Sequence, residues 1–174
     1  MEYEISNIVA TANLGTEIKL EVAMEFLRTV GKVTYVRRKF PGLVVKLRNR
    51  MSVLLFRTGK MVIAGGRSID DVKRAVKDVL RALRPALSDL PNALEVQIQN
   101  IVARADLGAE INLERLSGEM PGARYDPDQF PGLIYNPGFD KPTTLVFRTG
   151  KVVIVGAKSE EEIADIVKEL KKYI

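Results

Sequence analysis

Along the chain, the spacing of apolar residues switches between the alternation typical of strands and the spacing typical of helices, in a fixed order. Alternation over residues 4–11 predicts a strand, and helical spacing over residues 20–29 places Val22, Ala23, Phe26 and Leu27 on one stripe. Three further strands are predicted at about residues 33–36, 43–47 and 52–56, and a tight turn at Thr58 and Gly59 leads into a strand over residues 60–65. A helix is then predicted from an N-cap at Ser68 to about Leu83, just before Pro85.

The second part of the chain repeats the first. Asn7–Glu21 recurs at Asn100–Glu114 with most positions identical, and Phe-Pro-Gly-Leu occurs at both Phe40 and Phe130. The strand-turn-strand run from Leu54 to Ile63 recurs from Leu145 to Ile154, and a capped helix opening at Ser159 and running to Tyr173 ends the chain. A period of roughly 90 residues is too long for a solenoid repeat and fits two copies of one small α+β half.

The predicted organisation is therefore two repeats, residues 1–91 and 92–174, in one continuous domain with a pseudo-two-fold axis. The connection from Pro85 to Pro91 is too short to separate two independent domains. The predicted class is α+β with a mostly antiparallel sheet.

Both faces of the predicted sheet are apolar. Val53 and Leu55 alternate with Leu54 and Phe56, and the strand from Lys60 shows the same pattern. Two helices in each half can cover only one face. The other face would expose a patch larger than soluble monomers usually leave bare, so we expect something apolar or flat to bind there.

The amino-acid composition of the chain excludes several kinds of chemistry. The chain has 174 residues and contains no Cys, no His and no Trp, which excludes disulfides, thiolate metal sites and histidine-based catalysis. No Gly-rich phosphate loop or metal-spaced cluster is present, and Asp126 and Asp128 have the pattern of loop acids. We therefore expect no enzyme activity, cofactor, metal or small-molecule substrate. No signal peptide or transmembrane helix is predicted, and a net charge of +5 mildly favours a polyanionic partner.

These motifs carry a specific resemblance. The doubled Asn-Ile-Val-Ala, Phe-Pro-Gly-Leu and Phe-x-x-Gly-Lys-x-Val segments, in register over essentially the whole chain, resemble the TATA-box-binding protein family in its archaeal form. The resemblance implies a saddle, in which a curved ten-stranded antiparallel sheet sits on the DNA minor groove and four helices lie on the convex face. It also implies a general transcription initiation factor that binds and bends A·T-rich promoter DNA. The family is itself a standard example of minor-groove wedging.

The family's wedging side chains fall on four phenylalanines of this chain. By resemblance Phe40 pairs with Phe56, and Phe130 with Phe147, so that apolar rings enter between base steps. The alternative is that these are ordinary core phenylalanines, but their repeat-symmetric positions favour wedges.

The resemblance also assigns the groove floor. Asn7 and Asn100 open the first strand of each half and would donate to minor-groove acceptors. Two departures stand where the family usually has threonine, namely Ala64 and Val155, which make the floor more apolar and leave hydrogen bonding at the dyad to the two asparagines. The remaining floor positions, which would exclude the guanine amino group, are Val9, Leu54, Val62, Val102, Leu145 and Val153.

Phosphate contacts by resemblance fall on Lys39, Lys46, Lys60, Arg67, Lys151 and Lys158, with Asn136 replacing a usual basic residue.

The loop before Phe130 holds Asp126, Asp128 and Gln129, where the family docks transcription factor B, whereas its counterpart is Arg37-Arg38-Lys39. RNA polymerase would be an indirect partner of the protein. The cations of Lys73, Arg74, Lys77 and Arg81 would lie on the helix side, as a solvated surface or a protein contact.

Two other functions remain open at this point. A specialised paralogue of the family with relaxed specificity is one. The other is a sheet that binds RNA or single strands by stacking bases on exposed Phe, although aromatics at strand ends favour wedging. By resemblance the protein would be a monomer on DNA that can form a dimer off DNA, without a membrane partner. It would be cytoplasmic and nucleoid-associated in an archaeon, or nuclear in a eukaryote.

Overall fold

The structure is a computed structural model that describes residues 3–35 and 37–174. Its first elements are β1 (Tyr3–Asn13), α1 (Leu20–Leu27), β2 (Gly31–Thr34), β3 (Gly42–Leu47), β4 (Ser52–Phe56), β5 (Lys60–Gly66) and α2 (Ile69–Leu83). The same order recurs in β6 (Gln97–Asp106), α3 (Leu113–Glu119), β7 (Ala123–Arg124), β8 (Leu133–Tyr135), β9 (Thr143–Val146), β10 (Lys151–Ala157) and α4 (Glu160–Lys171). The duplication in sequence is thus a duplication in structure.

The described residues form one ten-stranded sheet and four helices. The strand order is β2-β3-β4-β5-β1-β6-β10-β9-β8-β7, in which the second repeat follows the first in reverse. Every strand pair with a defined register is antiparallel. The predicted α+β class and antiparallel sheet are confirmed.

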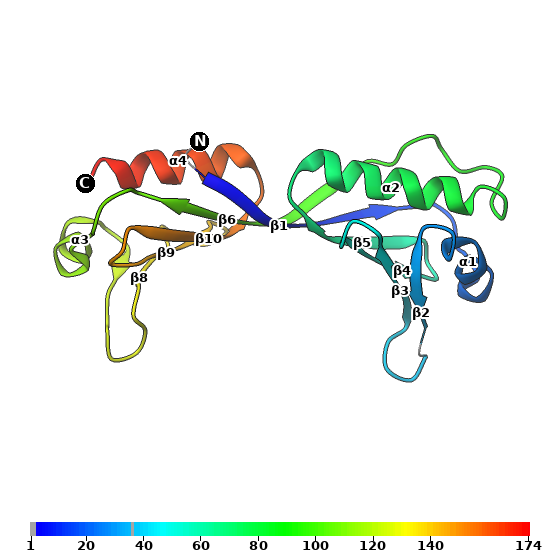
Figure 1. The fold of residues 1–174 in the computed structure, drawn as a ribbon, viewed down its shortest axis with the longest axis horizontal. Helices are drawn as coiled ribbons and strands as arrows, with labels where there is room; N and C mark the ends of the chain where they lie inside the picture. Colours follow the sequence, from blue (N-terminus) through cyan, green and yellow to red (C-terminus); the bar gives the residue numbers. More distant parts are fainter. Residues whose placement is uncertain (1–2, 36) are drawn as a thin grey trace. The chain divides into compact units, whose positions relative to one another are not determined.

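Two compact units divide these elements. One unit is Asn7–Gln99, and the other joins Asn100–Ile174 to the start of the chain up to Ser6. In the first unit α2 lies along one side of the strands, beside α1, and in the second α4 lies along β10 (Figure 1). Each helix buries one face of its own unit's strands.

The long helices begin where their caps predict. Ser68 Oγ accepts a hydrogen bond from Asp71 N at 3.1 Å, and Ser159 Oγ accepts one from Glu162 N at 3.2 Å. α2 buries most of its apolar stripe, including Val72, Val79 and Leu83. The sheet supplies the other wall of this core, with Leu55, Met61 and Ile63 fully buried in β4 and β5.

Several predicted boundaries are wrong, and the first strand is Tyr3–Asn13 rather than residues 4–11. The first helix ends at Leu27 rather than at residue 29, because Thr29 N and its hydroxyl both donate to Phe26 O in a tighter final turn. The last helix ends at Lys171, not at Tyr173, in another tight turn at the C-terminal end. The strand predicted over residues 33–36 is β2 at Gly31–Thr34, and Val36 lies outside the described residues.

Candidate nucleic-acid interface

Each predicted phenylalanine pair lies together in space. Phe40 lies in the loop before β3 and Phe56 ends β4, and their ring centroids are 5.5 Å apart with a 55° interplanar angle. Phe130 and Phe147 repeat this geometry at 5.9 Å and 57°. All four side chains are only half-buried, so the rings are not ordinary core residues. They contact one another and keep a solvent-facing side.

Glycines provide the seat for these rings. A Cβ added at Gly42 would lie 3.0 Å from the Phe40 ring and 3.2 Å from the Phe56 ring. At Gly132 the corresponding distances are 2.9 Å to Phe130 and 3.0 Å to Phe147. A side chain at either glycine would press on both rings of its pair, and at Gly42 it would also lie 2.9 Å from the Leu55 backbone oxygen. This function of the glycine in Phe-Pro-Gly-Leu was missed from sequence, although the doubled motif was the available signal.

Asn7 and Asn100 lie within β1 and β6, not at their openings, because β1 begins at Tyr3 and β6 begins at Gln97. Each amide oxygen accepts a hydrogen bond from a glycine N–H: Gly65 N to Asn7 Oδ1 at 2.9 Å, and Gly156 N to Asn100 Oδ1 at 2.8 Å. Gly65 and Gly156 have φ near +90° and occupy bulges where the strand register shifts. With the oxygens fixed, the two NH₂ groups are the ends left to donate to a ligand.

The sheet face opposite the helices is apolar in both units, as the alternation predicted. Leu54 and Val62 are cross-strand neighbours, as are Leu145 and Val153, and their sequence neighbours on the other face are buried. These floor side chains are partly exposed, and Val155 is 39% exposed. The partly exposed floor positions are Val9, Leu54, Val62, Ala64, Val102, Leu145 and Val153.

The predicted phosphate contacts differ between the units. The side chains of Lys39, Lys46, Lys60 and Arg67 are exposed and have no ion-pair partner within the described residues. In the second unit Lys151 donates to Asp106 Oδ2 at 2.6 Å, and Lys158 lies 3.7 Å from Asp140. The hydrogen bond from Lys151 lowers the pKa of the Asp106 carboxyl. Neither ion pair was predicted from the sequence.

The loops before Phe40 and Phe130 carry opposite charge. Asp126, Asp128 and Gln129 are all exposed, and Asp126 O accepts backbone hydrogen bonds from Gln129 N and Phe130 N at 3.0 Å. In the other loop Arg37 forms an ion pair with Glu21 and its guanidinium lies 5.9 Å from the Tyr35 ring centroid. Arg38 and Lys39 carry the remaining positive charge there.

Two positions on the apolar face were missed from sequence. Thr11 follows Asn7 and Val9 at every second residue of β1, and Arg104 follows Asn100 and Val102 in the same way in β6. Val62 is the cross-strand neighbour of Thr11, and Val153 is that of Arg104. Continuing the two-residue period from the asparagines would have found both.

The described residues contain no group of three or more His, Cys, Asp or Glu that could hold a metal ion. None of the helices there has the length and apolar character needed to cross a bilayer.

Comparison with known proteins gives a consistent result. Residues 2–86 and 95–174 match the family model described as transcription factor TFIID (or TATA-binding protein, TBP). A TATA-box-binding protein of Pyrobaculum aerophilum is 45% identical over 169 residues, 97% of this chain and 83% of the relative. One from Methanothermobacter thermautotrophicus is 43% identical over 163 residues, 93% and 88% of the two chains. The solved Methanococcus jannaschii TBP has a TM-score of 0.84 and 37% identity, and the match covers 99% of this chain and 97% of that one.

Proposed function

The chain belongs to the TATA-binding protein family of non-enzymatic transcription factors, and from this membership we propose that it binds A·T-rich promoter duplexes through the minor groove and bends them. The observation that carries the proposal is the pair of phenylalanine clusters, Phe40–Phe56 and Phe130–Phe147, with matching geometry in the two units. In this function the protein nucleates the assembly of transcription initiation complexes on chromosomal DNA.

The phenylalanines act as wedges. Unstacking a base step costs a few kcal/mol, and this cost is offset when the bent duplex contacts more protein surface. A wedge must be apolar, partly exposed and held in place before DNA arrives. The tilted ring pairs seated on Gly42 and Gly132 meet these three conditions.

The asparagines and the floor recognise A·T pairs. The NH₂ groups of Asn7 and Asn100 donate to adenine N3 or thymine O2, while the bulge glycines hold the amide oxygens. The apolar side chains around them offer no acceptor to the guanine amino group, so a G·C pair leaves a buried donor without a partner. Ala64 and Val155 add methyl groups where hydroxyls would bind, which reduces discrimination at the central pairs.

Phosphate contacts and a protein partner complete the proposal. Lys39, Lys46, Lys60, Arg67, Lys151 and Lys158 neutralise backbone charges and make affinity salt-dependent. The acidic loop with Asp126, Asp128 and Gln129 docks transcription factor B, which recruits RNA polymerase to one end of a nearly symmetric site.

The decisive experiment removes one wedge from each pair. Phe56→Ala with Phe147→Ala should lower the bend angle and cost at least tenfold in affinity for a selected duplex, with an unchanged circular dichroism spectrum because the rings are partly exposed. Phe139→Ala is the matched control, since that ring is 100% exposed and lies outside both pairs. Equal bending by the double variant would contradict the wedge assignment. Stronger binding of single strands or RNA than of duplex would favour the stacking alternative.

A further inference from the structure

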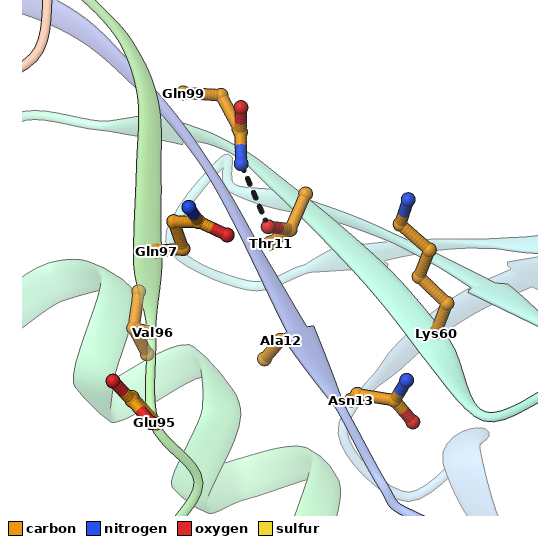
Figure 2. Close-up of a pocket in the computed structure, with 8 residues that line it drawn as sticks. All are labelled: Thr11, Ala12, Asn13, Lys60, Glu95, Val96, Gln97 and Gln99. Carbon is orange, nitrogen blue, oxygen red and sulfur yellow. Dashed lines mark hydrogen bonds between the residues drawn. The ribbon is translucent and has the colours of Figure 1, made fainter.

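Arg104 stands on the apolar face of the second unit at a position where the first unit has a neutral residue. The repeat aligns Arg104 with Thr11, since both lie four residues after the duplicated asparagine. Figure 2 shows Thr11 in the first unit, where its Oγ1 accepts a hydrogen bond from Gln99 Nε2 at 3.0 Å. The two repeats therefore present different chemistry at one matched position.

The surroundings of Arg104 place it within the predicted groove floor. Its cross-strand neighbour is Val153, and it follows Asn100 and Val102 on the same face of β6, while the intervening Ala103 and the following Ala105 are buried. A guanidinium at this point lies among the side chains that would meet base edges.

The guanidinium is held only loosely. Its ion pair with Glu4 spans 3.8 Å, and both side chains are about 60% exposed (60% and 61%). Exposed pairs of this kind contribute little, so Arg104 can exchange Glu4 for another acceptor at small cost. The repeat aligns Glu4 with Gln97, which belongs to the same unit as Thr11, is neutral and lines the pocket in Figure 2.

We propose that Arg104 is a specificity-determining residue that donates to minor-groove base acceptors under the second repeat and makes the two halves of the DNA site unequal. An arginine has N–H donors and no acceptor. Every A·T pair offers it adenine N3 or thymine O2, whereas a G·C pair adds the guanine amino donor, which opposes it. The half-site under Arg104 therefore demands A·T at one more position than the half-site under Thr11. This proposal rests on the function proposed above.

The experiment is a binding selection from random duplexes with four proteins: the unchanged sequence, Arg104→Thr, Arg104→Lys and Thr11→Arg. Arg104→Thr and Thr11→Arg each give one repeat the residue of the other. Because the chain has no cysteine, Gln129→Cys introduced into all four carries a single DNA-cleaving reagent that identifies the half-site bound by the second repeat.

We expect the parent protein to select an asymmetric site. Its affinity should fall about tenfold when G·C replaces A·T at one position under the second repeat, which is the usual scale of a single mismatch. Arg104→Thr should abolish this loss at that position alone, and Arg104→Lys should restore it only in part. Thr11→Arg should create a matching demand in the other half-site.

Two results would overturn the proposal while leaving the proposed function intact. One is uniform weakening of all sequences by Arg104→Thr with a salt slope lower by about one, which indicates a phosphate contact only. The other is unchanged preference in both half-sites. A parent protein that neither selects nor bends duplex DNA would overturn both proposals together, so the two failures are distinguishable.

Discussion

The two repeats agree in their apolar and amide groups and differ in their charges. The phenylalanine pairs, the glycine seats and the asparagine-to-glycine hydrogen bonds occur in both units with closely similar geometry. In contrast, Lys60 is unpaired within the described residues, whereas its counterpart Lys151 is bound to Asp106. The two units thus share the geometry of their apolar and amide groups and differ in their electrostatics.

The arginines beside the phenylalanine pairs show the same divergence. Arg148 follows Phe147 and pairs with Glu114 at 3.1 Å, and its guanidinium also donates to the Tyr125 hydroxyl. These two interactions raise the pKa of Arg148. In the first unit Arg37 from the loop occupies the equivalent partners, Glu21 and Tyr35, so Arg57 beside Phe56 has no ion-pair partner within the described residues. Arg57 and Lys60 therefore have no ion-pair partner within the described residues, whereas the aligned Arg148 and Lys151 are both paired.

The largest effect should come from the acidic loop. Asp126→Lys with Asp128→Lys replaces two exposed carboxylates with cations, and we expect at least a tenfold loss in assembly of the ternary complex with transcription factor B and DNA, because like charges then oppose the docking of a basic partner. Binary DNA binding should be unchanged or slightly stronger. Titration of transcription factor B onto preformed binary complexes measures both.

A neutral variant separates charge from loop geometry. Asp126 Oδ1 accepts a hydrogen bond from Asp128 N at 3.3 Å, and Asp126→Asn with Asp128→Asn keeps an oxygen acceptor there. We expect its loss of assembly to fall between those of the parent and the lysine variant. Arg38→Glu is the control in the other loop and should weaken binary binding with a shallower salt dependence. Full ternary assembly by the lysine variant would show that this loop does not orient the complex.

A smaller effect is expected from exchanging the strand-end residues Asn13 and Asp106. Both side chains accept a hydrogen bond from the glycine two residues on, at 2.9 Å, so the exchange changes charge and preserves the turn. Asp106→Asn should free Lys151, raise duplex affinity several-fold at low salt and steepen the salt slope by about one unit. Asn13→Asp should pair Lys60, its cross-strand neighbour, and do the reverse.

Affinity measured against salt concentration tests this exchange. The double variant Asn13→Asp with Asp106→Asn keeps the parent's net charge and should return the slope close to the parent's. Parallel slopes for all four proteins would show that Lys60 and Lys151 do not contact phosphates in the complex.

The sequence predicted those parts of the fold that depend on local signals. α2 was located correctly because Ser68 caps one end and Pro85 limits the other, and the apolar face followed from alternation in β4 and β5. The pairing of Phe40 with Phe56 came from resemblance to a family, since no local rule joins a loop to a strand end. The two-residue alternation from Asn100 predicts that Arg104 lies on the apolar face, but this position was missed from the sequence.

Other features required three-dimensional information. The Asp106–Lys151 pair depends on the register between β6 and β10, which the residues alone do not specify. The hydrogen bond from Gly65 N to Asn7 depends on a one-residue bulge whose position appears only when both strands are placed. Contacts across strands were thus the main limit of the sequence-based interpretation.

The smallest predicted effect concerns stability. Thr144 in β9 is completely buried, and its hydroxyl has no hydrogen-bond partner within the described residues, whereas the aligned residue in β4 is Val53, equally buried and apolar. An unpaired buried hydroxyl costs about 1–3 kcal/mol. Thr144→Val removes that cost with little change in shape, so the free energy of unfolding should rise by about 1 kcal/mol and Tm by roughly 2–4 °C. Thr143→Val is the control, because the Thr143 hydroxyl already accepts a hydrogen bond from Asn136 Nδ2 at 3.0 Å and its loss should not stabilise.

The reciprocal variant, Val53→Thr, should change the free energy of unfolding in the opposite direction. Val53→Thr buries a new hydroxyl in the first unit, beside Ile63 on the neighbouring strand, and should lower the free energy of unfolding by about 1 kcal/mol or more. Urea denaturation followed by circular dichroism measures all three variants under one set of conditions. If Thr144→Val is no more stable than the parent while Val53→Thr is clearly less stable, the second unit already satisfies its hydroxyl, through a bound water for instance.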